Sequence, residues 1–144
     1  MDDFDLKILK ILSVNGRITN SELSERVGLS KTPCQIRVKN MIQRGIIKGF
    51  RAVLNHDALD RNHISFTEVK LTDTRDNTLE LFNKAVMEIP EIVECHMIAG
   101  QFDYLLKVRT KNITDYRRAL GEKISTLPCV ANTSTHVAMQ AVKE

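Results

Sequence analysis

Two helical patterns on either side of residues 28–30 constrain the fold of this chain more than any other feature of its sequence. In the first pattern, Thr19 and Glu22 have the spacing of a capping box, in which each side chain bonds to the other residue's backbone N–H. In the second pattern, Ser30 is placed to cap a helix, and Pro33 lies in its first turn, where a missing N–H costs little. Two helices joined by so short a turn have the spacing of a helix-turn-helix.

The segments that flank this motif predict the rest of a small domain. Residues 3–16 have apolar side chains in helical register and end at an Asn-Gly pair, a common helix stop. Residues 46–55 have β-prone side chains on both sides of a Lys-Gly pair, which predicts a small wing hairpin. We therefore expect residues 1–54 to form a winged helix-turn-helix domain.

Basic residues are concentrated in this first part of the chain. The 144 residues carry a net charge of +3, but residues 17–51 alone contain eight Lys or Arg and only two Glu. Such a block within a folded segment indicates a phosphate-rich partner. On charge alone, a solvated basic face is the alternative.

The second helix of the motif has two contrasting faces. Its apolar residues recur at helical spacing and are expected to face the core. They are Cys34, Val38, Met41 and Ile42. The other face is polar apart from Ile36, which is suited to contact a thymine methyl group in a DNA major groove.

The polar side chains of this helix fall into two candidate DNA-binding groups. Those with the chemistry to read base edges are Gln35, Arg37, Lys39 and Asn40. Those better placed for phosphates, which set register and carry no sequence information, are Ser30, Lys31, Thr32 and Arg44. An alternative role for Arg37 is an ion pair with Glu22 or Glu25 on the preceding helix.

The pattern changes after the polar, aperiodic residues 55–63, which we interpret as a linker between domains. The segments that follow alternate between strand and helix patterns in the order βαββαβ. They are residues 64–72, 77–89, 91–99, 103–109, 113–127 and 130–139. We predict an α+β chain in which residues 64–144 form a ferredoxin-like domain.

The two helices of such a domain cover only one face of its sheet. The apolar sides of the two central predicted strands carry Val93, Cys95 and Met97, and Tyr104, Leu106 and Val108. Their opposite sides carry Ile92, Glu94, His96 and Ile98, and Leu105, Lys107 and Arg109. The uncovered face is too apolar for open water and too charged for a core, which favours self-association. An ordinary half-solvated antiparallel sheet is the alternative.

Other classes of protein find little support in the sequence. Cys95 and His96 are neighbours on a predicted strand, so their side chains point to opposite faces and cannot act together. The other histidines have no acidic partner at a recognisable spacing, so we expect no catalytic site, no metal site and no cofactor. The three cysteines form no close pair. No apolar run approaches the roughly 18 residues of a membrane span, and we expect a cytoplasmic protein.

Residues 98–106 form a second suggestive stretch. Gly100 brings backbone N–H groups to an exposed hairpin near Asp103, which could hold the carboxylate and ammonium groups of a free amino acid. The residues alone favour the alternative, a plain turn that Asp103 caps.

Taken together, these residues resemble the Lrp/AsnC (leucine-responsive, feast/famine) family of prokaryotic transcription factors. The resemblance runs from about Asp5 to Glu144 and rests on "GRITNSELSERVGLS", "RVKNM", "GIIKGFRAVLN", "GQFDYLLKVR" and "YRRALGE". It implies a winged helix-turn-helix joined to a ferredoxin-like ligand-sensing domain, and no enzymatic activity. It also implies double-stranded DNA, a small amino acid and further copies of the chain as partners, in dimers that usually assemble into octamers.

The resemblance further implies an effector site between dimers, built from the hairpin, the strand before it and the last strand. The implied residues are Met97, Ile98, Gly100, Gln101, Asp103, Tyr104, His136, Val137 and Ala138. Close relatives often have Tyr-Val-Val at residues 136–138, and often Pro-Gly-Val where this chain has Cys129 in the middle position. The implied effector is leucine, methionine or another apolar amino acid.

The function expected from all this is sequence-specific regulation of transcription, modulated by an amino acid. The alternative is a chromatin-like protein that coats DNA with little sequence preference and no effector response.

Overall fold

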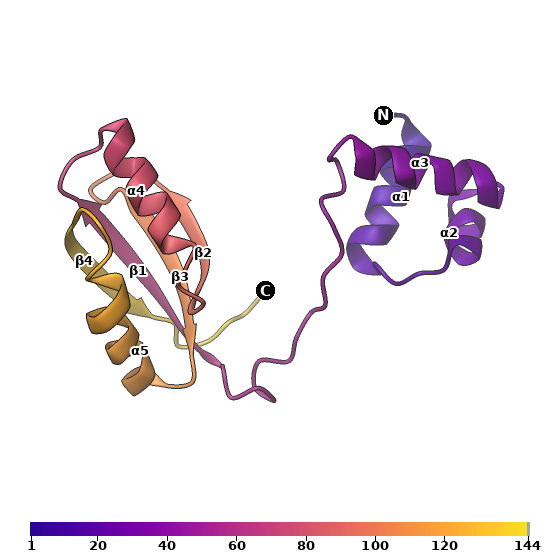
Figure 1. Ribbon diagram of the computed structural model, residues 1–144. Coiled ribbons are helices and arrows are strands. Elements are labelled where there is room, and N and C mark those ends of the chain that lie inside the picture. The colour runs from indigo at the N-terminus through magenta and orange to yellow at the C-terminus, as the bar shows by residue number, and fades with distance from the viewer. Residues whose placement is uncertain (144) are drawn as a thin grey trace. The chain divides into compact units, whose positions relative to one another are not determined.

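The computed structural model describes residues 1–143 and divides the chain into two compact units, Met1–Leu54 and a second that begins at Asn55 (Figure 1). Glu144, the last residue of the predicted ferredoxin-like domain, lies outside the described residues.

The first unit consists of three helices, α1 (Asp3–Val14), α2 (Asn20–Val27) and α3 (Lys31–Gln43). Each begins after a residue with extended backbone angles, and at α1 and α2 the side chain of that residue accepts one of the unpaired helical N–H groups. At α1, Asp2 and Asp5 form a complete capping box, since each carboxylate accepts a hydrogen bond from the other's backbone N–H. At α2, the Thr19 hydroxyl accepts from the Glu22 N–H at 3.2 Å.

Two details of the predicted caps are wrong. The Glu22 carboxylate does not return to the Thr19 backbone, because it forms an ion pair with Arg26, one turn further along α2, at 2.6 Å. Ser30 occupies the N-cap of α3 with extended backbone angles, but its side chain makes no capping hydrogen bond.

The core of this unit is small and comes from all three helices. The fully buried apolar residues are Ile8, Leu23, Val27, Cys34 and Met41. Ile42, predicted to face the core, is 46% exposed. Ile47, beyond the end of α3, packs against the cluster instead, so the chain after the helix closes the core.

The described residues between Gln43 and His63 contain no strand, so the predicted hairpin at residues 46–55 is not formed. Phe50, Val53 and Leu54 in this segment are exposed. A two-stranded ribbon is marginally stable in water without a third strand or a helix to cover its apolar side.

The second unit is a four-stranded antiparallel sheet with helices on one face (Figure 1). Along the chain its elements are β1 (His63–Leu71), α4 (Asp76–Val86), β2 (Ile92–Met97), β3 (Tyr104–Thr110), α5 (Ile113–Ala119) and β4 (Val130–Val137). The strand order is β2-β3-β1-β4. This confirms the predicted ferredoxin-like βαββαβ order. The predicted helix 113–127 is shorter than expected, since α5 passes into a π-helical turn at Leu120–Ile124.

The core of the second unit lies between the sheet and its two helices. Its members alternate along the strands, as expected where one sheet face is buried. They include Val69 and Leu71 of β1, Leu106 and Val108 of β3, Phe82 of α4, and Tyr116 of α5.

A bulge in β2 changes which residues of that strand face the core. The pairing with β3 shifts between Ile92 and Glu94, so that Ile92 lies opposite Val108 and Cys95 lies opposite Leu106. Val93, predicted to share the apolar side with Cys95, is instead 43% exposed. A bulge inserts one unpaired residue, and this reverses the alternation on its two sides.

Candidate functional site

The exposed face of α3 is the first candidate site. Its side chains recur at helical spacing and point away from the core. They are Thr32, Ile36, Lys39, Asn40 and Gln43, with Gln35 on one flank. Ile36 is 53% exposed although it is apolar. Gln43 was absent from the predicted DNA-binding residues, and its spacing of four residues from Lys39 places it on the same face.

The predicted phosphate-binding residues surround this face. Ser30, Lys31 and Thr32 are exposed at the amino end of α3, and Arg44 is exposed just beyond its carboxyl end. Backbone N–H groups and cations at a helix start are suited to contact DNA phosphates.

Arg37 differs from the other predicted base-reading residues because its guanidinium is already engaged. Arg37 Nη1 lies 2.8 Å from a carboxylate oxygen of Asp5 and 2.8 Å from one of Asp2. The guanidinium also lies 5.6 Å from the centre of the Phe4 ring. The alternative of an ion pair was therefore right in kind, but the predicted partners, Glu22 and Glu25, were wrong.

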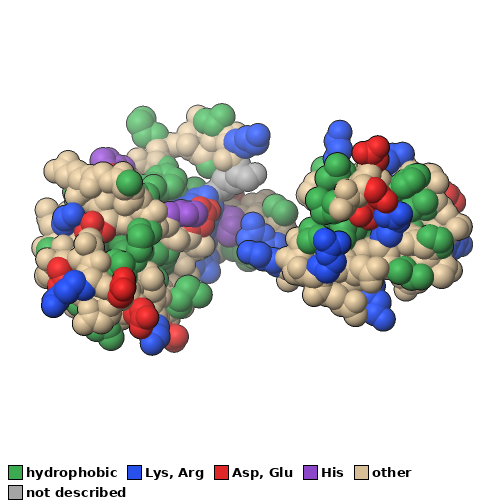
Figure 2. Space-filling view, turned by 90° about the horizontal axis from the view of Figure 1, so that it is seen from above, with side chains coloured by type: hydrophobic (Ala, Val, Ile, Leu, Met, Phe, Trp, Pro, Cys, Tyr) green, Lys and Arg blue, Asp and Glu red, His purple; other side chains and the backbone are tan. Residues whose placement is uncertain are grey.

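Arg37, Asp2 and Asp5 stabilise one another's ionised forms. The hydrogen bond that Arg37 donates to Asp5, and then the one that it donates to Asp2, raise the pKa of Arg37. The bond from Arg37 is the largest cause that lowers the pKa of Asp5. On the face shown in Figure 2, acidic and basic side chains of the first unit likewise lie side by side.

The hairpin between β2 and β3 is the second candidate site, and Asp103 anchors it. The Lys70 ammonium donates to Asp103 Oδ1 at 3.0 Å, and the Leu71 N–H donates to Oδ2 at 2.8 Å. Burial of Asp103 opposes its ionisation, but these two donors outweigh that effect and lower the pKa of the carboxyl group. Both carboxylate oxygens therefore hold the hairpin against β1.

Four predicted effector residues lie together around this hairpin. Met97 is 57% exposed, Ile98 is half-buried, and Gly100 and Gln101 are exposed. Gly100 has a φ of 153°, a backbone conformation that L side chains rarely adopt. Asp103 anchors the same hairpin, whereas Tyr104, which was also predicted here, does not belong to this surface.

Tyr104 points into the core on the helix side of the sheet. It is 2% exposed, its hydroxyl donates to Asn83 Oδ1 at 2.8 Å, and its ring lies 4.5 Å from that of Phe82. The prediction that Tyr104 contacts an effector is therefore corrected, because its register on β3 is that of the buried set.

The remaining predicted effector residues lie at the other end of β1. Ala138 donates its backbone N–H to the Ile64 carbonyl at 3.0 Å, whereas Asp103 donates to the Val69 carbonyl at 2.9 Å. Five residues of strand separate these two carbonyls by roughly 17 Å at about 3.3 Å per residue. His136, opposite Phe66, lies three residues of strand from Val69, or roughly 10 Å. A free amino acid is shorter than the distance from the hairpin to Ala138, which favours a site that two copies of the chain share.

His136 lies on the uncovered face of the sheet, opposite Phe66. Its Nε2 is 3.1 Å from a Glu68 carboxylate oxygen. Lys107 on the same face pairs with Glu94 at 3.5 Å. The face thus combines ion pairs with the apolar side chains of Phe66 and Leu105, as the alternation predicted.

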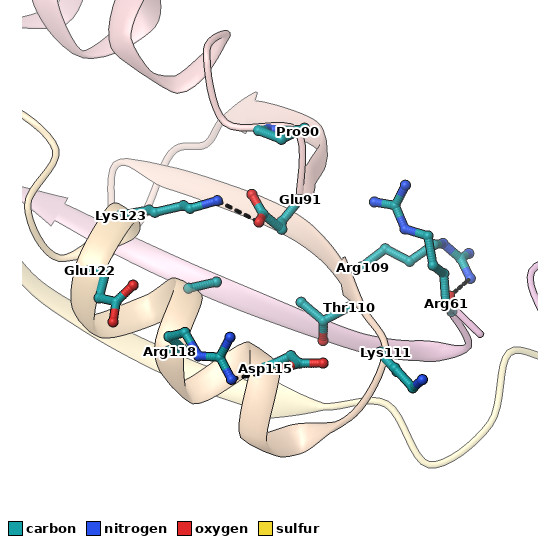
Figure 3. A pocket seen from close by; sticks show the side chains of 11 residues that line it. Arg61, Pro90, Glu91, Arg109, Thr110, Lys111, Asp115, Arg118, Glu122 and Lys123 are labelled. Carbon is teal, nitrogen blue, oxygen red and sulfur yellow. Dashed lines mark hydrogen bonds and ion pairs between the residues drawn. The ribbon is translucent and has the colours of Figure 1, made fainter. Parts of the chain in front are cut away.

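A hollow of about 610 Å³ lies between α5 and the ends of β2 and β3 (Figure 3). Its lining includes Lys123, which pairs with Glu91 at 2.6 Å, and Arg118, which lies 3.3 Å from Asp115. Arg109 donates to the backbone carbonyl of Arg61 across it. None of the predicted effector residues lines this hollow, and its ionic walls do not suit an apolar side chain.

The described residues contain no group of three or more His, Cys, Asp or Glu that could hold a metal ion. Within the same range, no helix is long and apolar enough to cross a membrane. Cys95 lies on the core side of β2, and His96 on the opposite side pairs with Glu94 at 3.3 Å.

Comparison with known proteins assigns these two units. Residues 64–144 match the Lrp/AsnC ligand binding domain, and residues 1–48 match a winged helix-turn-helix DNA-binding domain. The chain is 64% identical over 144 residues to a proline dehydrogenase transcriptional activator of Rhizobium radiobacter, which covers all of this chain and 92% of that protein. It is 53% identical to a protein of the same description from Rhodobacter capsulatus, over all of this chain and 94% of the relative.

Solved structures agree with this assignment. A transcriptional regulator from Neisseria meningitidis, crystallised in complex with L-Met, superposes with a TM-score of 0.93 at 29% identity, over 100% of this chain and 93% of that one. These relatives are regulators and not enzymes. The chain therefore belongs to the Lrp/AsnC family of transcriptional regulators, with a DNA-binding helix-turn-helix unit and an amino-acid-binding unit.

Proposed function

We propose that this chain activates transcription of a proline dehydrogenase gene and that proline is its effector. The observation that carries this proposal is the 64% identity, over the whole chain, to a relative described as such an activator. The alignment extends through both the DNA-binding and the amino-acid-binding unit. Proline is the substrate of proline dehydrogenase and belongs to the class of apolar amino acids that the family resemblance implies.

The effector binds between copies of the chain. The argument is the strand that separates the hairpin residues from the β4 set, roughly 10 Å to His136 and roughly 17 Å to Ala138. One copy contributes Met97, Ile98 and Gln101, with Gly100 shaping the loop and Asp103 holding it in place. Another copy contributes His136, Val137 and Ala138. Assembly through the uncovered sheet face into dimers, and of dimers into an octamer, brings the two sets together.

The exposed face of α3 reads the operator in the major groove. Gln35, Lys39 and Asn40 contact base edges, and Ile36 contacts a thymine methyl group. Ser30, Lys31, Thr32 and Arg44 hold the phosphates. The regulator acts where the DNA is, in the cytoplasm. An amino acid changes DNA binding only if it binds one arrangement of the assembly better than another.

Thermal unfolding of the purified chain with each of proline, leucine and methionine tests the effector. A ligand at 100 times its dissociation constant stabilises the folded state by about 2.7 kcal/mol, which shifts the melting temperature by several degrees. We expect the shift with proline. A shift with methionine alone favours the second candidate, for which the L-Met complex of the Neisseria regulator is the reason.

Binding to the DNA fragment upstream of the proline dehydrogenase gene, in the genome that encodes this chain, tests the target. We expect affinity at least tenfold above that for a random duplex of equal length, and a change in affinity when proline is added. Equal affinities for the two duplexes would contradict the proposal and favour the alternative of a chromatin-like protein that coats DNA with little sequence preference.

A further inference from the structure

The amino end of α1 places negative charge beside the DNA-binding helix. Asp2, Asp3 and Asp5 lie within the first turn or at its cap. Two of them, Asp2 and Asp5, hold a single guanidinium, that of Arg37, at 2.8 Å each. Two carboxylates against one guanidinium leave a net negative charge next to α3.

The position of Arg37 on α3 gives its guanidinium a second potential partner. Successive residues of an α-helix are about 100° apart, so Arg37 lies on the flank of the face that carries Ile36 at its centre. Arg44, two turns further along, lies on the same flank and is a proposed phosphate contact. The Arg37 side chain is 31% exposed, so it is not sealed from solution.

We propose that Asp2 and Asp5 compete with DNA phosphates for Arg37 and so act as a brake on the affinity of this chain for DNA of any sequence. Phosphate contacts supply nearly all of sequence-independent binding, and each one makes that binding more dependent on salt. Withholding one arginine therefore lowers the affinity for every duplex and flattens its salt dependence. The base-reading residues on the centre of α3 keep their role.

The capping box makes the brake a built feature of the fold. The two carboxylates that hold Arg37 also accept each other's backbone N–H groups, so the first turn of α1 fixes them in place. The same contacts lower the pKa of both Asp2 and Asp5. Both groups are therefore ionised at neutral pH, where DNA binding takes place.

The test is the salt dependence of binding to a 30-base-pair random duplex. The variant Asp2→Asn/Asp5→Asn removes both charges but retains a good N-cap residue, because Asn and Asp are equivalent at that position. We expect tighter binding at low salt and a slope of log K against log salt steeper by about 0.9, the value for one added phosphate contact. Between 50 and 200 mM salt this changes the ratio of affinities by about 3.5-fold.

A matched control separates release of Arg37 from simple loss of negative charge. Asp3→Asn/Glu25→Gln removes two acidic charges of the same unit, and neither residue makes an ion pair within the described part of the chain. We expect its slope to equal that of the wild type. Adding Arg37→Ala to the Asp2→Asn/Asp5→Asn variant should return the slope to the wild-type value.

Equal slopes for the double variant and the matched control overturn the proposal, as does a steeper slope that survives Arg37→Ala. Melting temperatures show whether each variant folds. If the double variant does not fold, Asp2→Asn alone is compared with Asp3→Asn, since the Asp2 side chain is 51% exposed and its removal disturbs little packing. Equal slopes for those two overturn the proposal in the same way.

Discussion

The hydroxyl groups of Thr67 and Tyr116 lie 2.9 Å apart in the core between β1 and α5. Thr135 on β4 bonds to the same tyrosine hydroxyl. One side chain thus satisfies polar groups on two neighbouring strands, at a depth where Thr67 has no exposed surface. A buried hydroxyl without a partner costs about 1–3 kcal/mol.

Tyr116→Phe is expected to lower the free energy of unfolding by about 1–3 kcal/mol, since it leaves the Thr67 hydroxyl without this partner. Urea unfolding measures the change. Tyr104→Phe is the matched control, because its hydroxyl partner, Asn83, is exposed and can turn to water. A loss as large for Tyr104→Phe as for Tyr116→Phe would show that burial of the partner is not the cause.

Asn40→Ala and Lys31→Ala are expected to weaken DNA binding in different ways. Loss of a base-reading amide costs about 1–3 kcal/mol at one base pair of the operator and leaves random DNA unaffected. Loss of a phosphate contact weakens all duplexes alike and reduces the salt slope by about 0.9. Titration of both variants with operator and random duplexes distinguishes a base contact from a phosphate contact. Equal losses of affinity on both duplexes for Asn40→Ala would show that Asn40 does not read a base.

Asp103→Asn is expected to destabilise the second unit in a pH-dependent way. The pKa of Asp103 is lowered in the folded chain, so its ionised form stabilises folding above the unfolded-state pKa of about 3.9. That contribution is lost as the pH falls through the folded-state pKa. The melting temperatures of wild type and variant should therefore differ at pH 7 and converge below about pH 4. A constant difference across this range would mean that the charge is not responsible.

An effector site shared between copies predicts that two defective chains restore each other. Gln101→Ala removes a hairpin contact, and His136→Ala removes one at the end of β4. Each variant alone should lose the proline-induced thermal shift, whereas a co-assembled mixture contains some sites with both native halves and should regain part of it. Calorimetric titration of the mixture with proline measures the fraction of sites restored. If the mixture binds no proline, the whole site lies within one chain.

The backbone of Cys129 is strained, and glycine at this position would relieve the strain. Its φ is 64°, in the left-handed region, where a side chain costs about 1–2 kcal/mol and glycine costs little. Cys129→Gly is expected to raise the free energy of unfolding by up to about 1 kcal/mol after the extra chain entropy of glycine is deducted. Cys129→Ala keeps the strain and should bring no gain in the same denaturant experiment.

Local signals in the sequence were sufficient for most of the fold. The alternation in β1 and β3, the Thr19 cap and the glycine after α2 each depend on residues a few positions apart, and periodicity detects such relations. The hairpin strands expected at residues 46–55 are absent from the described residues, because strand propensity alone leaves a two-stranded ribbon only marginally stable. The Ile92–Glu94 bulge was missed because a shift in pairing is a property of two strands together.

The candidate sites were harder to predict for the same reason. Exposure of Lys39 and Asn40 follows from helical spacing within α3. The partners of Arg37 lie more than thirty residues away in α1, and only the tertiary packing of three helices brings them together. Tyr104 was placed in the effector site by position in a motif, although its alternation with Leu106 and Val108 already pointed to the core.

The two hydrophobic cores, one in residues 8–41 and one in residues 69–127, have no residue in common among those described. Neither cluster needs the other to exclude water. A recombination event within residues 55–62 would therefore leave both cores intact and join an existing amino-acid sensor to a different DNA-reading helix. In a chain built this way, the signal that is sensed and the genes that are controlled can be inherited separately.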